Sequence, residues 1–188
     1  MSAESQQLEY ASWGQRFGAF WIDLFVLLPF AMVAAKLMWK PPFFSLVLLP
    51  LAVLGTAYPI VCHGLWGRTI GKRAMGIRVT ALDGSRITWR QACLRNAPDI
   101  IWLIANTYAL LLIYAHVAPE TYTGWPPTER MQLLKALYPP WHTGLTHGQN
   151  AWTYSEFIVM LLNKRRRALH DFVAGTIVQR EPTHRPPI

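Results

Sequence analysis

Charge is scarce in this sequence: Asp, Glu, Lys and Arg make up only 15% of its 188 residues, against about one quarter in a soluble domain. Cysteine is scarcer, and Cys62 and Cys93 exclude a disulfide scaffold and offer no C-x-x-C pair for zinc. No basic stretch opens the chain, so we expect no cleaved signal peptide. Hydrophobic residues reach 52%, which excludes a disordered chain and leaves a soluble core protein or a membrane protein.

The placement of the basic residues favours a membrane protein. Lys and Arg number 18 against 10 Asp and Glu, for a net charge of +8. Seven of the bases lie in residues 68–95 and six in residues 164–185. These two blocks flank long apolar stretches, which is the pattern of loops retained in the cytoplasm. We therefore expect anionic lipid head groups as partners of these bases and no nucleic acid.

Four apolar segments predict an all-α integral membrane protein, a four-span helical bundle. The predicted spans are residues 17–38, 43–65, 100–118 and 151–163. At 1.5 Å per residue the first is about 33 Å long, enough to cross a bilayer. The last contains only about 18 Å of apolar helix, and its crossing is inferred from the bases that follow it, which prefer the cytoplasm. This assignment places both termini in the cytoplasm, with residues 1–16 before the first span and 179–188 as a tail.

Two connections between the spans have a predicted structure of their own. Between spans two and three, residues 77–81 alternate as a strand, Asp83-Gly84 is a turn dipeptide, and residues 86–88 would return as the second strand of a small cytoplasmic β-hairpin. Thr88 is a predicted helix N-cap for a helix that starts at Trp89. On the outer side, residues 119–150 predict an aromatic, proline-rich loop with a short amphipathic helix at the interface.

Asp23 is the most informative residue because it lies about two turns inside the first predicted span. An ionised carboxylate in hydrocarbon costs at least ~2.5 kcal/mol, so Asp23 must find a donor or be protonated. Arg16 lies seven positions earlier, about 10 Å along the helix axis, too far for a tight pair. Arg16 and Asp23 therefore each need a partner elsewhere, and Asp99 and Asp171 are the candidates at the same depth. For Asp23 itself two interpretations remain open: a structural buried acid, and an ion or proton site.

Other polar and basic residues of the sequence are also site candidates. The polar groups predicted to gather, either as an ion or proton site or as a structural cluster, are Arg16, Asp23, Asp99, His170 and Asp171. The bases predicted to contact lipid or a partner are Arg68, Lys72, Arg73, Lys164, Arg165, Arg166 and Arg167. The stretch from Gly67 to Lys72 is one residue short of a phosphate loop and follows a span. We expect no catalytic residues, no metal site and no cofactor.

Three ordered motifs connect these residues to a known family. They are Arg16-Phe-x-Ala-x-x-Ile-Asp23, the stretch from Gly67 to Val79 with Asp83-Gly84 after it, and Leu169-His-Asp171-x-x-Ala-Gly-Thr-Ile-Val178. In these motifs the chain resembles the RDD family of prokaryotic membrane proteins, which is named for one Arg and two Asp; Arg16, Asp23 and Asp171 occupy those positions. The resemblance implies a small multi-span protein of the bacterial inner membrane, and residues 119–150 look like an insertion into it.

The sequence is compatible with two different functions. Cation/proton antiport is associated with some members of the family, so the resemblance implies a cation/proton exchanger or transport component, with Asp23 and Asp171 carrying the ion or proton. Four short spans make a thin pathway, so this function predicts a homo-oligomer. The alternative is a non-catalytic scaffold or accessory subunit that binds lipids and a protein partner. An enzyme is not expected, because no catalytic constellation supports one.

Overall fold

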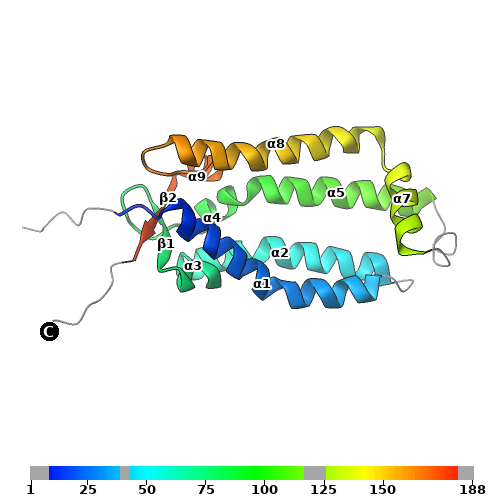
Figure 1. The fold of residues 1–188 in the computed structure, drawn as a ribbon, viewed down its shortest axis with the longest axis horizontal. Coiled ribbons are helices and arrows are strands. Elements are labelled where there is room, and N and C mark those ends of the chain that lie inside the picture. The colour runs from blue at the N-terminus through cyan, green and yellow to red at the C-terminus, as the bar shows by residue number, and fades with distance from the viewer. Residues whose placement is uncertain (1–8, 39–42, 117–125, 182–188) are drawn as a thin grey trace, which may run out of the picture. The chain divides into compact units, whose positions relative to one another are not determined.

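The computed structural model describes residues 9–38, 43–116 and 126–181, and most of them are helical (Figure 1). Its helices are α1 (Trp13–Met38), α2 (Phe43–Trp66), α3 (Ile70–Ala74), α4 (Trp89–Arg95), α5 (Ala97–His116), α7 (Pro127–Leu137), α8 (Pro140–Leu162) and α9 (Leu169–Ala174), and its strands are β1 (Ile77–Ala81) and β2 (Thr176–Arg180). The chain divides into two compact units. Unit 1 comprises residues 1–26, 58–96 and 155–188, and unit 2 comprises residues 27–57 and 97–154.

One helix is a clear candidate to cross a membrane. Within the described residues, the Trp13–Val33 part of α1 is long and apolar enough to span. The pair Trp89–Arg95 and Ala97–Ile113, broken at Asn96, meets the same test only if it is taken as one span. The structure thus contains long helices at all four predicted positions, and the four crossings remain a prediction.

The predicted hairpin is wrong in its second strand. β1 pairs antiparallel with β2, so that Val79 lies opposite Val178, whereas residue 86 makes only an isolated bridge to Thr80. The physical reason is burial. Thr176, Ile177 and Val178 of β2 are buried, whereas the segment after the turn is largely polar and exposed. The sheet therefore joins the connection after α2 to the far end of the chain, including residues predicted as a tail.

The predicted boundary of the outer loop is also wrong. Residues 140–150 form the first half of α8, which begins at Pro140, and α7 likewise begins at Pro127, close to the helix expected there. Proline suits the first turn of a helix because its φ is preset and the missing N–H has no partner there anyway. The two proline pairs thus start helices. Residues 119–125 of the predicted loop lie outside the described residues.

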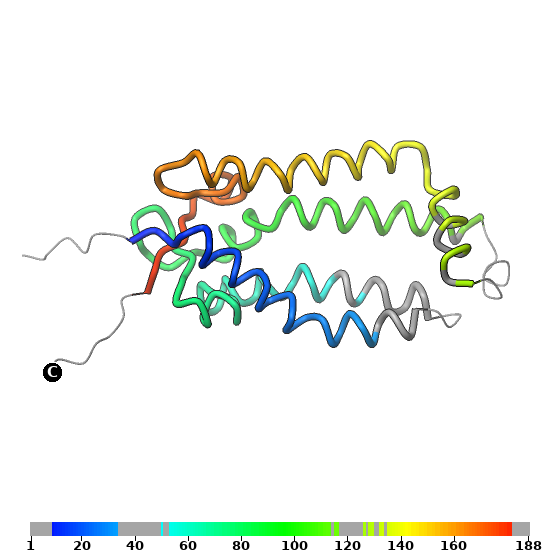
Figure 2. Tube along the Cα trace, in the orientation of Figure 1, coloured from blue at the N-terminus to red at the C-terminus, as the bar shows by residue number. Residues whose placement is uncertain are grey.

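The core of unit 1 gathers three distant parts of the sequence. Ala11, Ala19, Ile77, Val79 and Val178 are fully buried or nearly so in one cluster. The trace in Figure 2 shows the start of α1 beside the two strands. The backbone N–H of Ala11 donates to the Val178 carbonyl at 2.9 Å, which extends the sheet by a short third segment. Residues from the two ends of the described chain therefore pack together at the start of α1.

Glycine permits an unusually close contact between α3 and α1. A Cβ atom at Gly71 would lie 2.0 Å from the Ala19 carbonyl oxygen and 2.8 Å from the Asp23 carboxyl carbon. Only a residue without a side chain fits there. This approach brings the backbone of α3 to the acid inside α1, and it positions one part of the candidate site.

Unit 2 is held by polar and aromatic contacts between α5 and α8. The His142 ring contacts the Asn106 side chain at 3.0 Å, and Tyr108 stacks on Trp141 with ring centroids 6.1 Å apart. His142, which the sequence places in a surface loop, lies instead in a helix. Asp99 belongs to this unit, in the first turn of α5.

Candidate functional site

The carboxylate of Asp171 is positioned by the ends of a very short helix. Asp171 lies in the first turn of α9 and accepts a hydrogen bond from the Ala168 backbone N–H at 3.0 Å. At the other end Gly175 adopts the left-handed conformation, with φ of 64°, which glycine tolerates without strain. The chain then turns directly into β2, so that Thr176 lies beside Asp171.

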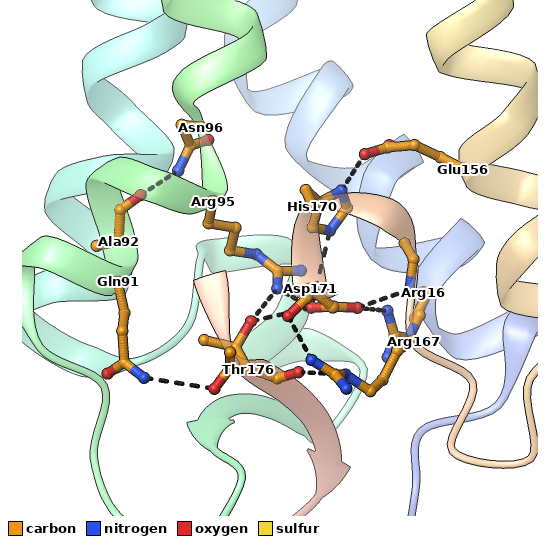
Figure 3. A network of polar contacts seen from close by, with 12 residues as sticks. Arg16, Gln91, Ala92, Arg95, Asn96, Glu156, Arg167, His170, Asp171 and Thr176 are labelled. Atoms are coloured by element: carbon orange, nitrogen blue, oxygen red, sulfur yellow. Dashed lines mark hydrogen bonds and ion pairs between the residues drawn. The ribbon is translucent and has the colours of Figure 1, made fainter. Parts of the chain in front are cut away.

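Two arginines converge on this carboxylate (Figure 3). Arg16 donates from Nη1 to Oδ2 of Asp171 at 2.8 Å, and Arg95 donates from Nη1 to Oδ1. Arg95 also donates to the Thr176 hydroxyl at 2.9 Å, and that hydroxyl donates to Asp171 at 3.2 Å. The Asp171 side chain has 0% exposure. Arg16, Arg95, Arg167, His170, Asp171 and Thr176 are called the Asp171 cluster below.

Arg167 and His170 complete the Asp171 cluster from the side of α9. Arg167 donates to the Asp171 carbonyl at 2.9 Å and to the Thr176 carbonyl at 3.1 Å. The His170 ring contacts Glu156 through Nδ1, and its Nε2 lies 3.9 Å from the Asp171 carboxylate. Helices α1, α4, α8 and α9 and strand β2 are thus connected through one group of side chains.

The electrostatics keep Asp171 ionised. Burial opposes its charge, but Arg95, His170 and Arg16 outweigh that effect and hold the pKa of Asp171 well below its usual range. A buried acid with two guanidinium partners is a fixed ionic contact, and removing one member leaves a charge without compensation. The Asp171 cluster is therefore suited to holding elements together.

Asp23 has a separate environment made of neutral donors. Its Oδ1 accepts from the Tyr58 hydroxyl at 2.8 Å and from the Gly71 backbone N–H at 2.7 Å, and its Oδ2 accepts from the Thr69 hydroxyl at 2.6 Å. Thr69 also caps α3 by accepting from the Lys72 N–H at 3.3 Å. Asp23, Tyr58, Thr69 and Gly71 are called the Asp23 cradle. Within the described residues, no basic side chain forms an ion pair with Asp23.

Some polar groups of unit 1 are buried without a hydrogen-bond partner among the described residues, and Lys72 lies in electrostatic range of both acids, Asp23 and Asp171. Burial of its ammonium group, and secondly the positive charge of Arg95, lower the pKa of Lys72 to about 8. His63 is 2% exposed, and among the described residues neither of its ring nitrogens has a hydrogen-bond partner. Nε and Nη2 of Arg16 are also buried and have no hydrogen-bond partner among the described residues. Buried polar groups of this kind mark an interior that is polar and incompletely satisfied.

The structure brings together only some of the residues predicted to gather. Arg16, His170 and Asp171 meet, Asp23 has its own cradle, and Asp99 lies in unit 2. Arg95, which the sequence did not assign to the site, joins Arg16 at Asp171. Its signal was an arginine at the entrance of an apolar segment, where such a side chain needs a buried partner.

Some of the predicted lipid-contacting bases lie elsewhere. Lys72 is half-buried, Arg167 belongs to the Asp171 cluster, and Arg68 is paired with Glu181. The exposed bases of that set are Arg73, Lys164, Arg165 and Arg166. Within the described residues, no group of three or more His, Cys, Asp or Glu could hold a metal ion.

The comparisons with known proteins give one match. A family model described as the RDD family matches residues 10–175. That range contains both acids and the arginine singled out from the sequence, together with Arg95 and every residue of the Asp23 cradle. No curated protein and no solved structure matches the chain.

Proposed function

The chain belongs to the RDD family, and from this premise we propose that it is a multi-pass protein of the bacterial inner membrane that exchanges a monovalent cation for a proton at Asp23. The Asp171 cluster is its structural anchor. The observation that carries the proposal is the Asp23 cradle. An acid within the candidate span is held there by two hydroxyls and one backbone N–H, without an ion-pair partner among the described residues.

Asp171 is poorly suited to exchange. A cation or proton arriving at its carboxylate would have to displace Arg16 or Arg95. The lowered pKa of Asp171 also means that it holds no proton at neutral pH. This separates the roles of the two acids: Asp171 connects elements, and Asp23 reacts.

The Asp23 cradle can serve both states of its carboxyl group. Hydroxyls donate as well as accept, so Tyr58 and Thr69 can stabilise the carboxylate and then reorient when it is protonated. Exchange at this position conserves charge, because the monovalent cation binds the carboxylate oxygens as the carboxyl proton leaves. Oxygen ligands suit hard cations. Lys72, which is in electrostatic range of Asp23, supports a polar route to the cradle rather than an apolar seal.

The test is ion-driven proton movement in liposomes that contain the purified protein. Asp23→Asn keeps the shape of the side chain but cannot release a proton, and we expect it to abolish the flux while the protein stays folded. Asp83→Asn, in the exposed turn after β1, is the matched control and should retain the flux. Full flux in a stable Asp23→Asn protein would refute exchange at Asp23. We also propose a homo-oligomer, because one chain of this size offers a thin pathway.

A second candidate function is a non-catalytic scaffold or accessory subunit. It is favoured by the aromatic surface of α1, where Phe20, Trp21 and Phe25 are 59%, 43% and 64% exposed. Together with the fixed Asp171 cluster, such a surface suits lipid or the helix of a partner protein. The liposome experiment distinguishes the two, because a scaffold would show no cation-driven flux in the unaltered protein.

A further inference from the structure

A pocket of about 260 Å³ lies beside the end of α2 in unit 1. Its lining includes Leu65, Trp66, Arg68, Arg78, Thr80 and Arg86. We infer that this pocket binds a phosphate-bearing anion and that its source is the head group of an anionic phospholipid. The inference does not depend on exchange at Asp23, which uses none of these side chains.

Two of the three arginines already converge on an anion. Arg68 donates from Nη1 to both carboxylate oxygens of Glu181, and Arg78 Nε lies 3.0 Å from the same carboxylate. Their side chains are 22% and 46% exposed, so a ligand can reach them. The three arginines carry more positive charge than the single carboxylate of Glu181 neutralises. The pocket can therefore attract a second anion, and guanidinium forks match phosphate oxygens well.

Thr80 supplies an independent sign of a ligand. It is 6% exposed, and its buried hydroxyl oxygen has no hydrogen-bond partner among the described residues. Strand residues two apart share a face, so Thr80 lies on the same side of β1 as Arg78. Both residues line the pocket. A hydroxyl left without a partner in a pocket lined by arginines is a ready donor to a phosphate oxygen.

The apolar part of the lining favours a lipid over a free anion. Leu65 and Trp66 are 42% and 58% exposed and end a helix whose sequence predicts a span. Tryptophan at the end of a span prefers the level of the lipid head groups. Arg86 reaches the same helix end, donating to the Gly64 carbonyl at 3.4 Å. A phosphodiester with attached acyl chains would use the arginines and the apolar side chains together.

Native mass spectrometry of the full chain in detergent tests the inference by titration with phosphatidylglycerol, phosphatidylcholine and inorganic phosphate. Phosphatidylglycerol should bind most tightly. Arg86→Gln and Thr80→Val should each weaken its binding, by about tenfold for a charge-assisted contact and less for the hydroxyl. Glu181→Gln should strengthen binding because it removes the competing carboxylate. Arg90→Gln, an exposed base on α4 outside the pocket, is the matched control and should bind as the unaltered protein does.

The outcomes separate the sources. Inorganic phosphate binding as tightly as phosphatidylglycerol would support the anion site and overturn the lipid as its source. Equal losses in Arg86→Gln and Arg90→Gln would overturn the site, because general surface charge would then explain the binding. Circular dichroism of each variant confirms that it is folded, and an unfolded Thr80→Val protein would leave Arg86→Gln and Glu181→Gln to decide.

Discussion

Replacing Asp171 by Asn tests whether the Asp171 cluster is a structural anchor. The substitution keeps the size of the side chain but removes the charge that compensates Arg16 and Arg95, whose side chains are 10% and 6% exposed. Breaking a buried ion pair by removing one partner costs about 3–5 kcal/mol. In a chain of this length each kcal/mol lowers the melting temperature by roughly 2–4 °C. We therefore expect Asp171→Asn to melt at least about 6 °C lower in detergent.

A double-mutant cycle distinguishes this effect from general disruption. If the loss comes from uncompensated guanidiniums, adding Arg95→Gln to Asp171→Asn should cost less than the sum of the two single changes, by more than about 0.5 kcal/mol. Glu129→Gln, an exposed acid on α7, should leave the melting temperature unchanged. Additive losses, or an Asp171→Asn protein that melts with the unaltered one, would refute the anchor.

Two further predictions concern α3. The pKa of Lys72 is lowered to about 8 from 10.5, so the unfolded chain binds more protons between those values and stability should rise with pH there. In a pH series of melting temperatures, Lys72→Met should remove this rise, and Lys135→Met, at an exposed lysine, should retain it. An unchanged rise in Lys72→Met would contradict the assignment. Gly71→Ala should destabilise the protein by about 1–3 kcal/mol, because the new Cβ would meet the Ala19 carbonyl. Gly55→Ala, with open space around the residue, should be neutral or stabilising. Equal melting temperatures of the two variants would show that the close approach does not matter.

Local signals in the sequence predicted the helices well. The run of apolar residues located α1 and α2, and the predicted N-cap Thr88 correctly marked the start of α4, where it forms a capping box with Gln91. These features depend on neighbours within a few residues. The first and third motifs, which contain Arg16 and Asp171, likewise identified the two members of one ion pair, because a charge next to an apolar segment requires a partner.

Long-range pairing could not be predicted from the same signals. β1 and β2 are separated by most of the second half of the chain, and nothing in the alternation of residues 77–81 identifies residues 176–180 as the partner. The hydrogen-bond donors of Asp23 could not be predicted from the sequence for a different reason. One is a backbone N–H, which has no sequence signature, and another is Tyr58, a hydroxyl on a largely apolar helix. The site assigned to Asp23 and Asp171 jointly thus divides into two environments.

The late position of Asp171 has a consequence for how the protein is made. Arg95 precedes its carboxylate partner by 76 residues, and Arg16 precedes it by 155. At about 5–20 residues per second, a ribosome needs roughly 4–15 seconds to add Asp171 after Arg95. During that interval both guanidiniums and the edge of β1 lack their final partners, so the nascent chain cannot complete this part of the fold until α9 and β2 have been synthesised.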